Sequence, residues 1–261
     1  MRISIASYAF HGLVKAGMMD VFGYLETCKH RYHIDAADIW NGIIGPDPAV
    51  YLTPEFLKKV KTALLEREMT LANYHADGCH IWEDDPDTRE RHHELAVAHL
   101  QAAAYLGAET VRIDAGGKGT VWTDEQFDEI VRRYQEYCAF GRDAGFTVGP
   151  ESHWGPELVP DNMERLAEAV NDPGFGILMH IGHWEGVPEE EGDRRLARYA
   201  VHTHVDARIT RTRLESAMKL LLDAGYLGHW GVEHHSAKNE YAEVEYQLAE
   251  VRHTLIKLQN P

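Results

Sequence analysis

Four segments in the C-terminal half of the chain each place an acidic or imidazole side chain directly after an apolar run. These side chains are Glu151, His180, His204 and Glu233, and successive members are 29, 24 and 29 positions apart. Two carboxylates and two imidazoles that meet at one point can bind a divalent metal ion. A single histidine near a strand end is usually only a hydrogen-bonded polar residue, but four such residues at regular intervals argue against coincidence. His183, three residues beyond His180, is expected in a loop, where it would contact a substrate.

The elements that must position these residues alternate along the chain between short apolar runs and amphipathic helical stretches. The expected strands are Arg2–Ala6, Ala36–Trp40, Thr70–Tyr74, Thr110–Ile113, Phe146–Pro150, Gly176–His180, Ala200–Val205 and Trp230–Glu233. The expected helices are Thr53–Glu68, Asp87–Leu106, Thr123–Ala144, Asp161–Val170, Glu189–Tyr199, Arg213–Ala224 and Glu240–Leu258. This alternation predicts parallel βαβ units.

Eight such strands in a chain of 261 residues predict an α/β fold, a single (β/α)8 TIM barrel that forms one domain over residues 1–261. A doubly wound sheet is the weaker alternative, because no GxGxxG follows the first strand and no GxxxxGK[ST] occurs. Active sites of TIM barrels lie at the carboxyl ends of the strands. All four candidate ligands are therefore expected at one mouth of the barrel.

The composition narrows the set of partners. The net charge of −16 argues against nucleic acid and anionic membranes as partners. No apolar run approaches the roughly 18 residues of a membrane span, and the first residues lack the features of a signal peptide. Three cysteines without CxxC spacing fit a reduced, cytoplasmic protein.

The stretch from Phe146 to His235 resembles the xylose isomerase-like TIM barrels, a family that includes sugar isomerases and epimerases. Glu151-Ser-His-Trp-Gly155, followed by Pro160-Asp-Asn-Met163, is similar to the family's segment after the fifth strand. V201-H-T-H-V205 resembles its His-x-His seventh strand, and G225-Y-L-G-H-W-G-V-E233 resembles the run that leads into its last glutamate.

The resemblance implies one divalent ion held by Glu151, His180, His204 and Glu233. Mn²⁺ is the favoured ion, with Co²⁺, Fe²⁺, Zn²⁺ and Mg²⁺ as alternatives. The sixth strand of the family usually ends in Asp, and a histidine there would shift preference away from Mg²⁺. Glu151 and Glu233 would also be the catalytic acid/base pair, each binding the ion through one oxygen and leaving the other free. The expected substrate-binding residues are His183, Glu157, Arg208 and His75, although His75 could equally be a loop histidine bonded to backbone.

The expected function is a metal-dependent isomerase or epimerase of a small-molecule sugar or sugar derivative. It would abstract a proton next to a carbonyl and pass through a metal-stabilised enediolate. A lyase, dehydratase or C-glycoside-cleaving enzyme acting on keto sugars is the main alternative. An endonuclease IV-like phosphodiesterase and a non-catalytic sugar-binding barrel are less favoured. The sequence leaves open whether the chain forms a homo-oligomer.

Overall fold

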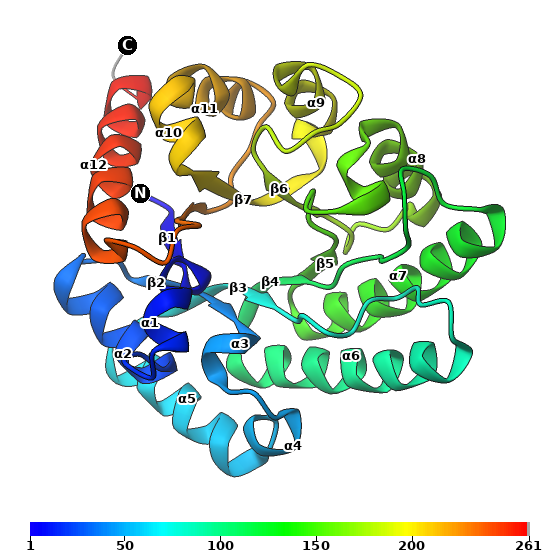
Figure 1. Cartoon of the computed structure of the whole chain (residues 1–261), viewed down its shortest axis with the longest axis horizontal. Coiled ribbons are helices and arrows are strands. Elements are labelled where there is room, and N and C mark those ends of the chain that lie inside the picture. Colours follow the sequence, from blue (N-terminus) through cyan, green and yellow to red (C-terminus); the bar gives the residue numbers. More distant parts are fainter. Residues whose placement is uncertain (260–261) are drawn as a thin grey trace.

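The computed structural model describes residues 1–259, so the last two residues of the expected domain lie outside the described chain. In this part of the chain eight parallel strands form one sheet. They are β1 (Ile3–Ala6), β2 (Ala36–Trp40), β3 (Thr70–His75), β4 (Ala108–Arg112), β5 (Thr147–Gly149), β6 (Ile177–His180), β7 (Ala200–Asp206) and β8 (Trp230–Glu233). The strand order is β5-β4-β3-β2-β1-β8-β7-β6. Figure 1 shows the strands as an inner ring with the longer helices outside.

The ring closes between the two end strands of this order, β5 and β6. Bridges join Val148 to Phe175 and Glu151 to Leu178. The backbone N–H of Gly176 donates to the carbonyl of Val148 at 3.1 Å. The predicted α/β class and TIM barrel are therefore confirmed.

Two glycines permit the close approach of neighbouring strands where the ring closes. A Cβ atom on Gly149 would lie 1.6 Å from the carbonyl oxygen of Gly176, and one on Gly176 would lie 2.2 Å from Cγ1 of Val201. No side chain fits at Gly149 unless the backbone moves, and one at Gly176 would have to displace Val201 of β7. The contact between β5 and β6 next to Glu151 therefore requires glycine at position 149, and the contact with β7 requires a small residue at position 176.

Replacing Gly149 by alanine is expected to lower the free energy of unfolding by about 3 kcal/mol, because the added methyl group forces the two strands apart. Urea unfolding with an unchanged m-value would measure this loss. Gly23→Ala in α2 (Val21–Glu26) is the control, since its nearest contact would be 3.5 Å away. That variant should be neutral or more stable by about 0.5–1 kcal/mol. Equal stabilities of the two variants would contradict the role of Gly149.

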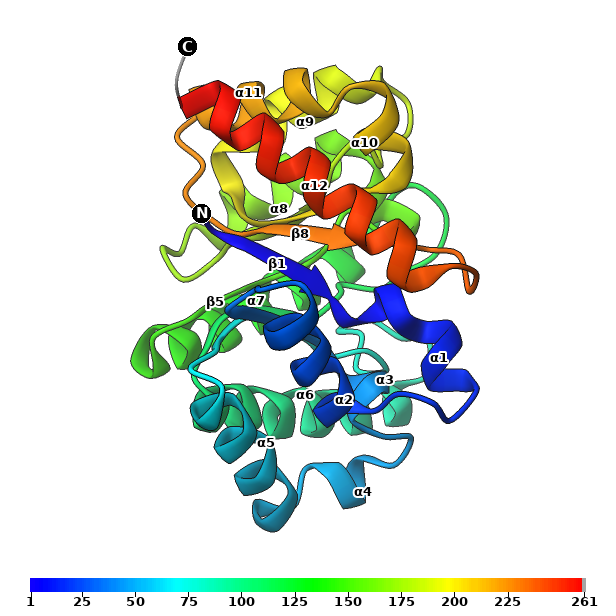
Figure 2. The same ribbon diagram turned by 90° about the vertical axis from the view of Figure 1, so that its left-hand side faces the viewer.

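The helices surround the ring. Besides α2 they are α1 (His11–Lys15), α3 (Asn41–Ile44), α4 (Pro48–Tyr51), α5 (Pro54–Glu66), α6 (Pro86–Leu106), α7 (Asp124–Ala144), α8 (Pro160–Val170), α9 (Glu189–Leu196), α10 (Ala207–Thr212), α11 (Leu214–Asp223) and α12 (Glu240–Gln259). Short 3₁₀ turns cover Ser7–Phe10, Gly155–Leu158 and Ala197–Tyr199, and a π-helical turn covers Thr27–Arg31. Figure 2 shows α12 beside β8 and close to β1, where the chain begins.

The helix boundaries follow the capping signals in the sequence. Thr123 and Gln126 form a capping box at the start of α7. Gly107 and Gly145 end α6 and α7 in the left-handed conformation, with φ of 82° and 89°. The structure adds α1 to α4 and α10, which the sequence analysis did not name.

The structure also bears on the expected absence of a membrane span and on the state of the cysteines. No helix among residues 1–259 is long and apolar enough to cross a membrane. The three cysteines are free and buried.

Candidate metal centre and active site

The four candidate ligands lie together at the carboxyl ends of the last four strands. His180 ends β6, His204 lies within β7, Glu233 ends β8, and Glu151 comes two residues after β5. All four are buried. The register pairs His180 with His204 across β6 and β7. Sequence positions that are far apart thus reach one point because the strands are parallel and adjacent.

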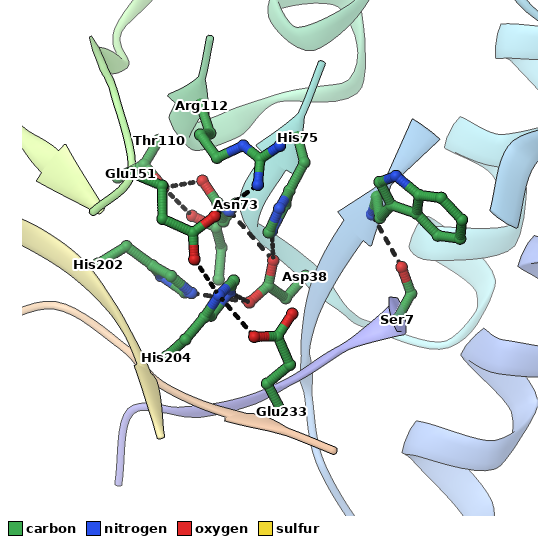
Figure 3. Close-up of polar contacts among 12 residues, drawn as sticks. Ser7, Asp38, Asn73, His75, Thr110, Arg112, Glu151, His202, His204 and Glu233 are labelled. Carbon is green, nitrogen blue, oxygen red and sulfur yellow. Dashed lines mark hydrogen bonds and ion pairs between the residues drawn. The ribbon is translucent and has the colours of Figure 1, made fainter. Parts of the chain in front are cut away.

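Their ligand atoms converge at short range. Oε1 of Glu151 lies 2.9 Å from Nδ1 of His204 and 3.1 Å from Nδ1 of His180. Oε2 of Glu233 lies 3.3 Å and 3.6 Å from the same two nitrogens. Ligand atoms about 2.1 Å from one ion would be roughly 3.0–3.4 Å apart, so the set fits a divalent cation. Figure 3 shows how Glu151, His204 and Glu233 face one another.

The charges of the cluster also fit a cation. Burial opposes a charged imidazole, yet Glu233 and Glu151 raise the pKa of His204 well above its usual value. Burial also opposes charged carboxylates, yet His204 and the other cationic groups nearby hold the pKa of both glutamates well below the usual range. Burial lowers the pKa of His180 to about 4, so its imidazole is neutral, the form that binds metal. The cluster therefore favours positive charge at its centre.

The fully buried carboxylate of Asp38 in β2 contacts three histidines of the cluster. It accepts hydrogen bonds from Nε2 of His75 at 2.5 Å and of His202 at 2.8 Å, and from the amide of Asn73 at 3.1 Å. It also lies 3.3 Å from Nε2 of His204. A histidine that donates one ring N–H to a carboxylate presents its other nitrogen to a metal in a fixed orientation. Asp38 thus directs Nδ1 of His204 into the site (Figure 3).

Arg112, the last residue of β4, lies beside Glu151. Its guanidinium donates to Oε2 of Glu151 at 2.5 Å, contacts Asp114 at 3.2 Å and forms an ion pair with Asp77. The second oxygen of Glu151 is therefore not free, in contrast to the expectation from sequence. By contrast, Oε1 of Glu233 has no hydrogen-bond partner among residues 1–259 of the protein.

A cavity of about 460 Å³ opens above the ligand set. Its walls are formed by Tyr8, Trp40, His75, Asp77, Arg112, Glu151, His153, His180, His183, Glu233 and His235. Small-molecule sites usually measure about 300–1,000 Å³. The rings of Tyr8 and Trp40 meet edge to face at 5.2 Å and supply an aromatic side to an otherwise polar cavity. The space suits a small polar molecule.

Two of the four expected substrate contacts line this cavity. The ring of His183 stacks on that of His180 with centroids 3.6 Å apart. Its loop is held by buried Asp193, which accepts hydrogen bonds from the backbone of Gly182 at 2.9 Å and from the indole of Trp184 at 2.8 Å. His75, the second contact, is part of β3 and not of a loop.

The other two expected contacts lie outside the cavity walls. Glu157 is fully buried and accepts a hydrogen bond from the backbone of Ala115 at 2.5 Å. Burial and the nearby Asp114 raise its pKa well above the usual value. Arg208 pairs with Glu189 at 2.6 Å and lines an adjoining pocket of about 640 Å³. The structure thus separates this pair from the ligand set.

Several residues of the site were not singled out from sequence. They are Asp38, Asp77, Arg112 and, as a partner of Glu233 at 2.8 Å, His235. A signal existed for two of them. Asp38 and Arg112 are charged residues inside apolar strand runs, and a buried charge without a partner is strongly unfavourable.

Comparison with known proteins identifies the family. Residues 34–253 match the model of the Xylose isomerase-like TIM barrel family, and the chain belongs to this family. No curated protein shows a significant sequence match to the chain.

Solved structures with the same fold include a D-tagatose 3-epimerase-like protein, with a TM-score of 0.75 and 16% identity over 99% of this chain and 100% of that chain. A probable 3-DHS dehydratase from Bacillus anthracis has a TM-score of 0.71 and 13% identity over 97% and 99% of the two chains. A xylose isomerase-like TIM barrel protein from Mycobacterium smegmatis, in complex with magnesium, has a TM-score of 0.65 and 14% identity over 89% and 90%. At such identities the likeness shows the fold.

Proposed function

We propose that the protein is a divalent-metal-dependent enzyme that isomerises or epimerises a small sugar or sugar derivative by moving a proton next to a carbonyl. One observation carries this proposal. Two carboxylate oxygens and two imidazole nitrogens from consecutive strands converge at the floor of a polar cavity of about 460 Å³. The name of the D-tagatose 3-epimerase-like structure supports a sugar substrate.

Glu151, His180, His204 and Glu233 would hold the ion. When bound, the ion would polarise the substrate's carbonyl and stabilise the negative charge that develops there. Mn²⁺ is the favoured ion, because a set of two nitrogens and two oxygens is softer than the all-oxygen set that suits Mg²⁺.

The cavity walls would orient the substrate. His183 and His75 would exchange hydrogen bonds with hydroxyl groups, while Tyr8 and Trp40 would cover an apolar face of the sugar. Glu157 and Arg208 would contact the substrate only after leaving their present partners. The free, unpaired cysteines support a cytoplasmic location.

The test combines metal analysis with a substrate screen. Protein loaded with Mn²⁺ is incubated in deuterated water with ketoses and 3-keto glycosides, and NMR follows deuterium at carbons next to the carbonyl. We expect deuterium uptake together with a rearranged sugar for at least one substrate. A metal-loaded protein that labels none of them would contradict proton transfer.

Elimination is the second candidate, because the free oxygen of Glu233 could remove the same proton and the electron pair could then expel a β-leaving group. The dehydratase among the solved structures is consistent with this fold carrying such chemistry. The screen separates the two, since elimination yields an unsaturated product with new ultraviolet absorbance.

His180→Asp is expected to keep a metal site but to reduce the preference for Mn²⁺ over Mg²⁺ by on the order of tenfold, because a hard oxygen replaces a nitrogen ligand. Calorimetric titration of both ions measures the preference. His253→Asp, on the exposed face of α12, is the control and should leave both affinities unchanged. An unchanged ratio in His180→Asp would remove His180 from the ligand set.

A further inference from the structure

The two glutamates of the ligand set have different surroundings. Both oxygens of Glu151 are engaged, since Oε1 faces the two histidine nitrogens and Oε2 accepts from Arg112 at 2.5 Å. The backbone N–H of Glu151 also donates to Asp114 at 3.3 Å. Glu151 is therefore fixed along its whole length.

Arg112 cannot easily release Glu151. Its side chain is 5% exposed and is surrounded by three carboxylates, those of Glu151, Asp114 and Asp77. Asp77 is itself held by the indole N–H of Trp40 at 2.5 Å. Charge-assisted hydrogen bonds in a buried site are strong, and breaking one would leave charges without partners. The bond to Oε2 of Glu151 is thus a lasting feature of the site.

Glu233 is bound on one side only. Its Oε2 faces Nδ1 of His204 at 3.3 Å and Nε2 of His235 at 2.8 Å. Its Oε1 has no protein partner among the described residues, and the side chain lines the cavity. Figure 3 shows this oxygen on the side of the carboxylate turned away from His204. Of the two glutamates, only Glu233 therefore has a carboxylate oxygen available to a substrate.

We propose that Arg112 makes the two glutamates unequal, so that Glu151 serves only to hold the ion and Glu233 alone moves the substrate's proton, on a single face of the substrate. This inference rests on the proposed function and narrows it. Inversion by two bases needs a free carboxylate on each face of one carbon. The site offers one, so the reaction would be the interconversion of an aldose with a ketose, or an elimination, and not epimerisation by two bases.

The step is balanced without a co-reactant. Oε1 of Glu233 takes the proton from the carbon next to the carbonyl. The electron pair of the broken C–H bond forms a carbon–carbon double bond, and the π electron pair of the carbonyl moves onto its oxygen. In the isomerisation the same carboxyl group returns the proton to the former carbonyl carbon, and a hydroxyl proton moves between the two oxygens. In the elimination the carbonyl forms again, the β-substituent leaves with the electron pair of its bond, and the proton held by Glu233 neutralises it. Arg112 is a positioning residue in this scheme, because it acts through Glu151.

The first test compares Glu233→Gln with Glu151→Gln in protein saturated with Mn²⁺, using the sugar that is labelled most rapidly in the deuterium screen. Glu233→Gln should retain the ion and lose deuterium exchange by on the order of 100-fold or more. Glu151→Gln should bind Mn²⁺ more weakly but, once saturated, exchange within about tenfold of the unmodified protein. Glu245→Gln, an exposed change on α12, is the control for handling and should change neither.

The second test concerns Arg112 and measures on which face of the substrate carbon deuterium enters. The unmodified protein should label one face only and form no inverted epimer. Arg112→Gln frees Oε2 of Glu151, so label should also appear on the opposite face. A purely structural loss would lower the rate without changing the face. Arg112→Lys keeps a positive charge next to Glu151 and should largely preserve single-face labelling.

The outcomes separate the two proposals. Equal loss of exchange in the two metal-saturated Gln variants, or an inverted epimer from the unmodified protein, would overturn the division of roles and leave the proposed function standing. Single-face labelling by a folded, metal-bound Arg112→Gln variant would overturn the role of Arg112. If that variant does not fold, the comparison of the two Gln variants still decides. No exchange by the metal-loaded protein with any sugar would overturn both proposals.

Discussion

Removal of the metal by EDTA is expected to lower turnover of the proposed sugar substrate by at least about a thousandfold, and added Mn²⁺ should restore it. A divalent ion at the carbonyl supplies several kcal/mol of charge stabilisation, and each 1.4 kcal/mol corresponds to about a factor of ten in rate. Without the ion, His204 would carry the only positive charge between Glu151 and Glu233. Turnover and metal content measured on the same dialysed samples would test this expectation.

Thermal unfolding provides the control for metal removal. An ion that binds only the folded chain at 100 times its dissociation constant stabilises it by about 2.7 kcal/mol. The stripped protein should therefore remain folded but melt at a lower temperature. Full turnover in a sample shown to be metal-free would contradict the proposed role of the ion. An unfolded stripped sample would show instead that the ion is needed for the fold.

Asp38→Asn is expected to weaken Mn²⁺ binding by about 10- to 100-fold and to lower the free energy of unfolding by about 3–5 kcal/mol. The amide keeps the shape of the carboxylate but loses its charge and one acceptor oxygen. His75, His202 and His204 would then compete for a single acceptor. Metal titration and urea unfolding would measure the two effects.

Asp35→Asn is the matched control, three positions earlier on the same segment. Its side chain is 70% exposed and, among residues 1–259, pairs only with Lys29. Exposed ion pairs contribute about 0–1 kcal/mol, so this variant should differ little from the unmodified protein. If Asp38→Asn binds Mn²⁺ as tightly as Asp35→Asn does, the support of His204 by Asp38 is disproved.

The sequence predicts the barrel well where local signals are strong. The bounds of β2 and β8 agree with the predicted runs, because Ala36–Trp40 and Trp230–Glu233 are mainly apolar strands that are buried almost throughout. The α7 helix agrees with the predicted stretch Thr123–Ala144 to within one residue, since it is capped by Thr123 and ends at Gly145. The four-residue helices α3 and α4 escaped prediction, because one turn is too short for an apolar period to appear.

The ligand set could be predicted because each member lies at the end of a strand in a regular repeat. Asp38 and Arg112 could not be assigned in the same way, because their roles depend on partners that lie far away in sequence. His202, for example, lies 164 positions from Asp38, and Glu151 lies 39 from Arg112. Arg208 lies outside the cavity walls because it pairs with Glu189. Its spacing from His204 in the sequence does not reveal this pairing.

The mixed nitrogen and oxygen ligands of the site have a consequence for handling the protein. Affinity of such a set for divalent ions rises along the Irving–Williams series from manganese to copper, so nickel and copper should bind more tightly than Mn²⁺. The ion found after purification would then reflect the growth medium and the chromatography resin, and not the ion used in the cell. Copper bound in place of Mn²⁺ would inhibit the proposed reaction. Expression in medium of defined metal content, without a nickel column, would avoid both effects.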